Sequence, residues 1–298
     1  MASVLQQLAG LLRDPAPEFA FEISERGIAW ARDGGSPQFQ PLEPGVLTVS
    51  PLADNVLKYD ALADAIRRIT GGPSVARKRR RAVLILPDHS ARLSVMRFEQ
   101  FPTDPKEQAS LVRFRMRKSV PFDIDAAALS FEATSAKPPL DVIVAVCALD
   151  IVARYEAAFR SAGVYPGHVT TSSLSAAELV RSAGVSVLAR RAGRLMSVSV
   201  IQAQMPKLVR TVELAHEDDP EEVLSVLFPT LAYIEDELGT QAGRVVHCGF
   251  EEGGRTPEWF TELQIPAERL QSRFGAPDGS NAGLLGYIES VSGGVKAA

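Results

Sequence analysis

The feature that most constrains the fold of this chain is a repeated succession of short apolar segments and amphipathic segments. Between residues 82 and 163 the pattern predicts strand, strand, helix, strand and helix, and the second half repeats this rhythm without a detectable sequence repeat. Such a mixed order indicates an α/β protein. Strands are expected within 19–35 (a hairpin), 82–87, 92–102, 141–149, 185–214 (with turns near Gly193 and Pro206) and 243–250, and helices within 59–72, 150–163, 164–184, 218–239, 256–265 and 280–291.

Length and charge limit the classes of protein that remain. With 298 residues, the chain can form one large or two modest domains whose cores need no disulfides. A net charge of −4 argues against a nucleic-acid-binding protein. The two cysteines, Cys147 and Cys248, form no CxxC motif and no disulfide framework, which indicates a reducing compartment. The apolar run 142–149 is far shorter than the roughly 20 residues of a membrane span, and the N-terminus is a poor signal peptide, so a cytosolic protein is expected.

Two segments allow two interpretations each. Residues 3–12 are predicted to form a short amphipathic helix, either docked on its own domain or frayed, or else used for a membrane or a partner. The polar face of this helix lacks the lysines and arginines of interfacial helices, which favours the first interpretation. The basic run 77–81 is interpreted as a solvated linker, with contact to an anionic lipid or partner as the alternative.

The segment 111–132 gives two conflicting signals. Apolar and basic residues alternate over 112–117, which is typical of a strand. Upstream, the sequence Thr-Asp-Pro at 103–105 is typical of a helix start, and Pro121 is typical of a helix end. Local pattern alone does not decide between strand and helix here.

No motif of a catalytic or metal site is found. None of the four histidines has ligand spacing to a second histidine, cysteine or acid, so no metal site is predicted. The motifs GxSxG, GxGxxG and GxxxxGK[ST] are absent. Ser172 and Ser173 have no histidine near them in the sequence and are interpreted as helix caps rather than nucleophiles. The histidines are His89, His168, His216 and His247.

The central part of the chain contains the stretch LVRFRMRKSVPFDIDAAALSFE, followed by DVIVAVCALDIVARYEAAFRSAGVYPGHVTTSSLSAAELV. These residues resemble the PilM family, whose pattern there is a basic helix ending in Pro-Phe, a strand, and a helix ending in Ala-Gly before an extended piece. LAYIEDELG, the strand into Gly249 and NAGLLGYIE follow in the family's order. The resemblance covers about residues 20–295 and is strongest over 81–180.

PilM proteins are actin-like cytoplasmic proteins of type IV pilus assembly, similar to FtsA and to the cytoplasmic part of GspL. The resemblance therefore implies an α/β, actin-like (ribonuclease H-like) fold of two lobes with an inserted small subdomain. The implied boundaries are 17–81 plus 163–184 for the first lobe, 82–162 for the inserted subdomain and 185–298 for the second lobe.

The family segment that matches the ambiguous stretch is a helix, which favours the helical interpretation. Thr103 is then expected to cap this helix and Pro121 to end it. Helical geometry would scatter the arginines of this segment round the axis, so that some reach an interface, although ordinary solvated arginines are the alternative. The expected partner-binding residues are Arg115, Arg117 and Phe122.

Actin-like ATPases carry a phosphate motif on the first hairpin of each half, and both motifs are degenerate here. The matching stretch FEISERGIA has Glu22 in place of the Asp that holds Mg²⁺ through water, Ser24 in place of a Gly, and Ala29 in place of a Lys. The second motif needs another Asp, but Ala189 or its neighbour stands there, and no acidic residue lies between positions 178 and 213. Because Mg²⁺ is held by one or two carboxylates with phosphate oxygens, metal-assisted hydrolysis is not expected.

Nucleotide binding stays open, because the arginines at 190, 191 and 194 could bind phosphate without metal. The expected cofactor is none, or ATP without efficient hydrolysis. Ser24 and Gly249 are the expected cofactor-binding residues if nucleotide is bound, and no catalytic residue is expected.

The resemblance implies a cytoplasmic scaffold, peripheral at the inner membrane, in a type IV pilus or type II secretion-like assembly platform. Its expected partners are the N-terminal peptide of a PilN-like membrane protein and other platform proteins, with no nucleic acid and with membrane contact only through partners. An active actin-like ATPase or a sugar-kinase-like enzyme is the alternative, and a protein unrelated to pili that kept the fold is a third possibility.

Overall fold

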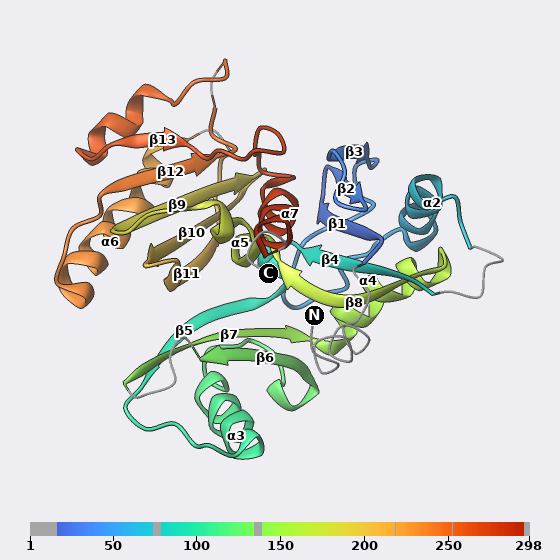
Figure 1. The fold of residues 1–298 in the computed structure, drawn as a ribbon, viewed down its shortest axis with the longest axis horizontal. Coiled ribbons are helices and arrows are strands. Elements are labelled where there is room, and N and C mark those ends of the chain that lie inside the picture. The colour runs from blue at the N-terminus through green and yellow to red at the C-terminus, as the bar shows by residue number, and fades with distance from the viewer. Residues whose placement is uncertain (1–16, 74–78, 134–138, 218, 252, 295–298) are drawn as a thin grey trace, which may run out of the picture.

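A computed structural model describes residues 17–73, 79–133, 139–217, 219–251 and 253–294. The helix expected at 3–12 lies outside these residues, as do the first two residues of the basic run. Within the described part, two five-stranded sheets and one three-stranded sheet are connected by helices (Figure 1). None of the helices described is both long and apolar enough to cross a membrane.

The first sheet contains the predicted N-terminal hairpin and has the order β3-β2-β1-β4-β8. β1 pairs antiparallel with β2 and parallel with β4, and β8 pairs parallel with β4 at one edge. Every residue of β1 is buried because the sheet is covered on both faces. The strands are β1 Phe19–Ser24, β2 Gly27–Arg32, β3 Gln38–Pro41, β4 Arg80–Leu86 and β8 Val164–Thr171.

Alternation along β1 divides its side chains between two layers. Phe21 packs on one face with α2 and α4, where it contacts the fully buried ring of Phe159. Ala20 and Ala29 lie on the other face with Leu284 of α7, and their small size lets that helix approach closely. The helices are α2 Tyr59–Thr70, α4 Leu149–Ser161 and α7 Ala282–Gly294.

The second sheet has the order β11-β10-β9-β12-β13, with β9 and β12 parallel at its centre. β9, β10 and β11 form two successive hairpins. The first turns at Gly193, as predicted, and the second turns at Ala203 and Gln204, both with positive φ, two residues before Pro206 pairs within β11. The strands are β9 Val185–Ala192, β10 Leu195–Gln202, β11 Met205–Glu213, β12 Arg244–Cys248 and β13 Ala267–Arg269.

The second sheet is covered by α6 (Pro220–Leu238) and by η4 (Glu258–Leu263). α6 begins after the N-cap Asp219 and ends at Gly239 in the left-handed conformation, which agrees with the predicted helix. The predicted helix at 256–265 is a short 3₁₀ helix instead, which begins after Pro257 and ends at Gln264 with positive φ.

α5 (Ser172–Ala176), η3 (Ala177–Leu179) and α7 lie between the two five-stranded sheets (Figure 1). α5 and α7 cross so closely that a Cβ added at Gly286 would lie 1.9 Å from the carbonyl oxygen of Ser175. Leu179 and Leu285 pack with Leu188 and Val246 of the second sheet. This helical layer therefore joins the two lobes through apolar contacts.

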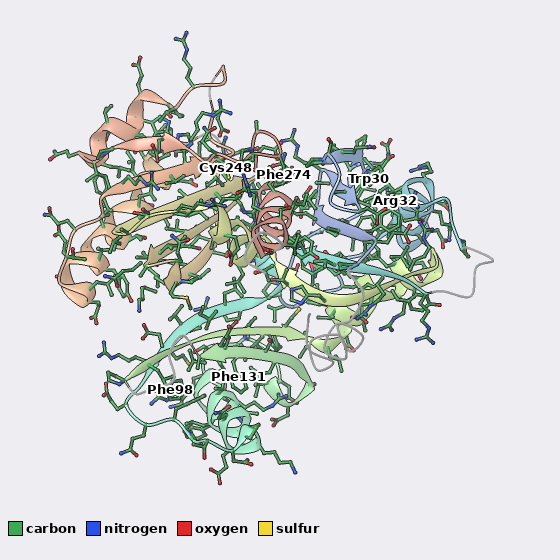
Figure 2. The ribbon with its side chains drawn as sticks, in the orientation of Figure 1. Trp30, Arg32, Phe98, Phe131, Cys248 and Phe274 are labelled. Carbon is green, nitrogen blue, oxygen red and sulfur yellow. The ribbon has the colours of Figure 1, made fainter. Side chains whose placement is uncertain are left out.

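The inserted sheet has the order β5-β7-β6, with antiparallel pairing throughout. Phe98 and Phe131 lie on its α3 side (Figure 2) and pack with Val112 and Met116 of that helix. The predicted insertion, 82–162, includes β4 and α4, but β4 pairs with β1 and α4 packs on the first sheet. The inserted elements are β5 Arg92–Phe98, α3 Pro105–Met116, η2 Ile124–Ala126, β6 Ala127–Ala133 and β7 Leu140–Ala148.

The ambiguous segment is a helix, as the family resemblance implied, but its expected ends are wrong. Asp104 rather than Thr103 is the N-cap, and its carboxylate accepts hydrogen bonds from the backbone N–H groups of Lys106 and Glu107. α3 ends at Met116, before Pro121 is reached. Only Val112 and Met116 are buried, one turn apart, so the alternating pattern does not describe the buried face.

Candidate functional site

Polar side chains gather where β1 and β4 meet the second sheet. Glu22 comes from β1, Asp88 follows β4 in η1 (Asp88–Ser90), and Arg190 comes from β9 of the other sheet. Their exposed fractions are 1%, 2% and 5%, so these charged groups are removed from water. We call this group the interlobe cluster; it comprises Glu22, Asp88, Ser172, Ser173, Arg190 and Ser197.

Asp88 is the most highly bonded member of the interlobe cluster. From the first lobe it accepts hydrogen bonds from the Ser173 N–H at 2.7 Å and the Ser173 hydroxyl at 2.6 Å. From the second lobe it accepts from Arg190 Nη2 at 2.8 Å and from the Ser197 hydroxyl at 2.7 Å. Burial alone would raise the pKa of Asp88, but the Arg190 charge and the bonds from Ser173 together hold this pKa below its usual value.

Glu22 has fewer partners and the opposite shift. Its Oε1 accepts a hydrogen bond from the Ser172 hydroxyl at 2.6 Å, and its Oε2 accepts from the Leu284 N–H at 2.7 Å. Arg190 Nη1 is 3.8 Å from Oε1. Burial outweighs these favourable contacts and raises the pKa of Glu22 above its usual value.

Arg190 fills the space between the two carboxylates. Its Nη1 donates to the Gly279 carbonyl at 2.6 Å, and its Nη2 donates to Asp88. Burial disfavours the cation, but Asp88 and Glu22 together raise the pKa of Arg190 above its usual value, so it stays charged. Ala189, aligned with the missing acid, packs in the core of the second lobe, because successive strand residues face opposite ways.

The cavity beside the interlobe cluster is small. It measures about 50 Å³ and is lined by Ser24, Arg190, Gly193, Ser197 and Ser280, among others. Small-molecule sites usually measure about 300–1,000 Å³. This cavity is therefore too small for an ordinary small-molecule ligand.

The two residues expected to bind a cofactor, Ser24 and Gly249, have different structural roles. Ser24 lines the small cavity, and its hydroxyl donates to the Gly27 carbonyl at 3.0 Å, closing the β1–β2 turn. Gly249 follows β12 with φ of 81°, and a Cβ there would lie 2.0 Å from the Arg191 carbonyl oxygen. Gly249 is therefore required by close backbone packing, whether or not a nucleotide binds.

Sequence reasoning missed two members of the interlobe cluster and misassigned two more. Ser172 and Ser173 make no side-chain cap for α5; they donate to Glu22 and Asp88 instead. Asp88 could have been found from the sequence, because it lies two residues after a buried parallel strand, and functional groups of α/β folds gather at such strand ends. Ser197 had no signal, since it is one of several serines in an alternating strand.

A second hollow, which we call the apolar groove, lies beside the inserted sheet. It measures about 530 Å³. The face of the inserted sheet opposite α3 contributes Ile143, Ala145 and Cys147, and α5 contributes Leu174. β6 and β8, each at the edge of its own sheet, both border it. The β10–β11 turn and α7 also line it, so all three parts of the fold contribute.

The predicted partner-binding residues lie on the α3 side of the inserted sheet, away from the apolar groove. Arg115 lies 4.1 Å over the Phe98 ring and donates to the Arg97 carbonyl at 2.8 Å. Arg117 forms an exposed ion pair with Asp125 at 3.0 Å. Phe122 packs partly buried on the α3 core. Their role in binding stays a prediction.

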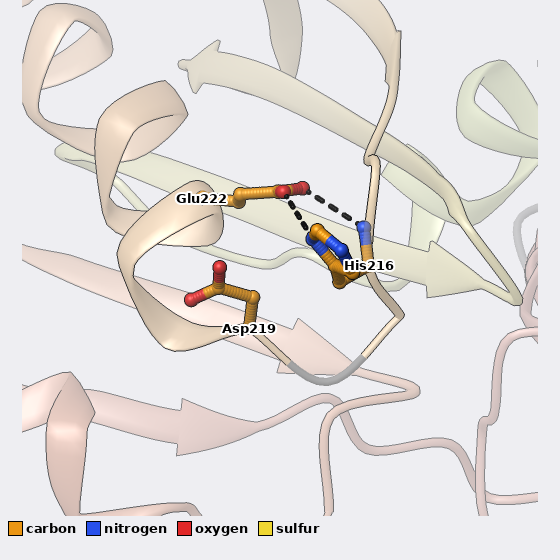
Figure 3. A group of neighbouring side chains, drawn as sticks. All are labelled: His216, Asp219 and Glu222. Carbon is orange, nitrogen blue, oxygen red and sulfur yellow. Dashed lines mark hydrogen bonds and ion pairs between the residues drawn. The ribbon is translucent and has the colours of Figure 1, made fainter.

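His216, Asp219 and Glu222 place potential metal-ligand atoms within 4.8 Å of one another (Figure 3), a group that sequence spacing did not reveal. Helix capping accounts for these contacts. Asp219 accepts from the Glu221 N–H, and Glu222 accepts from the Ala215 and His216 N–H groups and contacts His216 Nδ1 at 2.9 Å. The His216 ring is largely exposed. The absence of a metal site stays a prediction.

Comparison with solved structures identifies the fold. A PilM–PilN type IV pilus biogenesis complex matches with a TM-score of 0.70 and 17% identity, over 93% of this chain and 99% of that chain. The cytoplasmic domain of EpsL, an inner membrane component of the type II secretion system of Vibrio cholerae, matches with a TM-score of 0.51 and 11% identity, over 92% and 94% of the two chains. No family model and no curated protein sequence matches the chain.

These structures confirm the α/β actin-like fold and the fold-level likeness to PilM that the sequence suggested. The likeness spans nearly the whole of both chains. Because the identity is 17%, this likeness establishes the architecture alone, and any function must be argued from the geometry of the sites.

Proposed function

We propose that this chain is a cytoplasmic scaffold of a type IV pilus or type II secretion-like inner-membrane platform, and that it binds the N-terminal peptide of a PilN-like membrane protein. The observation that carries the proposal is the apolar groove, in a fold like that of PilM in a PilM–PilN complex. In the part of the chain that the structure describes, two edge strands of different sheets border this groove. The chain would reach the membrane through this partner.

The apolar groove suits an extended peptide better than a compact ligand. Within the described residues, β6 and β8 are edge strands, and the outward backbone N–H and C=O groups of such edges accept an added strand. Main-chain hydrogen bonds would supply affinity, and alternate side chains would enter the apolar walls near Ile143 and Leu174.

Charge at the rim adds a preference. Glu132 and Glu178 both line the apolar groove and are exposed, while the described groove lining contains no lysine or arginine. An apolar peptide carrying a lysine or arginine beside its apolar residues would therefore match better than an acidic one. Exposed pairs contribute little affinity, so this charge selects among peptides rather than holding them.

The interlobe cluster supports the scaffold over the enzyme. Arg190 occupies the space beside Glu22 and Asp88, and the remaining cavity of about 50 Å³ is too small for a nucleotide unless the cluster rearranges. No feature of the described residues favours an active ATPase or a sugar kinase over a scaffold.

Calorimetric titration with the N-terminal peptide of a PilN-like protein encoded nearby tests the proposal. Ala145→Arg puts a long cation into the apolar groove and should weaken binding at least about tenfold, or ~1.4 kcal/mol. Ser110→Arg adds the same side chain at an exposed site on α3 and serves as the matched control. Absence of peptide binding by the parent chain would refute the proposed partner.

The earlier prediction for α3 forms a second arm of this experiment. Arg115→Ala, Arg117→Ala and Phe122→Ala should weaken binding if the peptide instead lies on the α3 side, after folding of each variant is confirmed. A loss with these variants and none with Ala145→Arg would assign the peptide to the α3 side. The reverse result would assign it to the apolar groove.

A further inference from the structure

The two five-stranded sheets are joined at two places of different chemistry. One is the helical layer, where α5, η3 and α7 make apolar contacts with both sheets. The other is the interlobe cluster, where Arg190 of the second lobe meets Asp88 of the first. We propose that Arg190 and Asp88 form an interlobe latch, an internal ion pair that holds the two lobes closed without a bound ligand.

Asp88 is the point at which the lobes meet. Ser173 fixes the carboxylate within the first lobe through two hydrogen bonds. Arg190 and Ser197, from neighbouring strands of the second sheet, supply two more. Four short bonds to one carboxylate, two from each lobe, define the relative position of β4 and the β9–β10 hairpin.

Arg190 is held in place on its own side of the interface. The Gly279 carbonyl, which precedes α7, accepts from Nη1 at 2.6 Å and orients the guanidinium. Its Nε has no hydrogen-bond partner among the described residues, so the cation depends on these few contacts. Separating the lobes would leave the charges of Arg190 and Asp88 unpaired until water entered, which opposes opening.

The latch differs from the helical layer in chemistry, because Arg190 and Asp88 form a buried ion pair between the lobes, whereas the layer joins the sheets through apolar contacts. Loss of a mere packing element would lower protection throughout the chain. Loss of a latch would first expose the facing segments of β4, α5 and the β9–β10 hairpin, while the outer helices α2 and α6 lose less protection.

Hydrogen exchange with mass spectrometry on the full chain, without any peptide or nucleotide, separates these cases. Arg190→Met keeps much of the side chain's length and removes its charge, and Asp88→Asn keeps the shape of the acceptor. Ser197→Ala removes one of the two second-lobe bonds and is the mildest change. Arg194→Met is the matched control, because Arg194 lies on the same hairpin and pairs with exposed Glu213 within its own sheet.

In all three latch variants, exchange is expected to rise at least about tenfold in segments 83–90, 172–179 and 187–199, with the smallest rise in Ser197→Ala. The rise in α2 and α6 should be smaller than in these segments, and the Arg194→Met control should match the parent throughout. If Arg190→Met does not fold, Arg190→Lys and Ser197→Ala give the same comparison. Unchanged exchange in the facing segments, or an equal rise throughout the chain, would overturn the latch.

Discussion

Two hollows border α5, and they differ in size and chemistry. The one at the interlobe cluster measures about 50 Å³ and is crowded by buried charges, whereas the apolar groove measures about 530 Å³ and is bounded by β6 and β8, which are edge strands among the described residues. Ser172 lines the first, and Leu174 lines the second. In the described part of the chain, buried charged side chains surround a small cavity between the lobes, and a larger apolar cavity lies beside the inserted sheet.

The contrast between the two hollows suggests different functions for two sites of one fold. A charged cleft that is satisfied by its own side chains gains rigidity and loses room for a ligand. Among the described residues, the apolar groove keeps apolar walls and two edge strands, which an added strand could cover. We therefore expect changes in the interlobe cluster to act on stability, and changes in the apolar groove to act on binding.

The largest effect is expected from Asp88→Asn. It leaves the Arg190 cation buried without its carboxylate, and breaking a buried pair in this way costs about 3–5 kcal/mol. Urea denaturation at neutral pH measures the loss. Asp125→Asn, which removes an exposed pair with Arg117, should cost less than about 1 kcal/mol. Equal losses in the two variants would refute the importance of burial.

A smaller effect is expected from Gly286→Ala in the helix that packs on the wall shared by both hollows. The new Cβ would lie 1.9 Å from the Ser175 carbonyl oxygen, so α7 must move away from α5 at a cost of roughly 1–3 kcal/mol. Gly184→Ala is the control, since a Cβ there meets no atom closer than 4.0 Å. A Gly286→Ala variant as stable as this control would show that the two helices can separate freely.

The two carboxylates of the interlobe cluster should respond oppositely to pH. The lowered pKa of Asp88 stabilises the fold at neutral pH, and this contribution is lost as pH falls through that pKa. The raised pKa of Glu22 means that the folded state holds its proton more tightly, so stability falls as pH rises from the usual glutamate range through the raised value.

Glu22→Gln removes the second of these effects. A neutral amide can donate to the Ser172 hydroxyl and accept from the Leu284 N–H, so stability at neutral pH should change by less than about 1 kcal/mol. Unfolding free energies measured across pH should show a smaller decline with rising pH than in the parent. An unchanged pH profile would mean that Glu22 is not the titrating group.

The architecture could be predicted from the sequence further than the sites could. The succession of apolar and amphipathic segments predicted the α/β order, because each strand and helix carries its own local pattern. Arg190 and Asp88 are 102 positions apart, and no local pattern reveals that they meet. The apolar groove depends on β6 and β8 being edge strands of different sheets, which only the topology decides. In α3, the buried residues Val112 and Met116 lie one turn apart and do not mark where the helix begins. The N-cap is Asp104, one residue after the Thr103 that the sequence predicted.

The smallest effect, none at all, is expected from nucleotide. To occupy the interlobe region, MgATP would have to displace Arg190 from Asp88 and fit beside Glu22, whose raised pKa favours the neutral form and so weakens it as a metal anchor. We expect no Mg²⁺-dependent ATP turnover above background, and no rise in melting temperature at millimolar MgATP. A ligand present at 100 times its Kd adds about 2.7 kcal/mol of stability, so binding of that strength would raise the melting temperature measurably. Turnover that scales with protein and is lost in Glu22→Gln would show that the interlobe cluster opens to form an active site, and the contrast between the two hollows would then not hold.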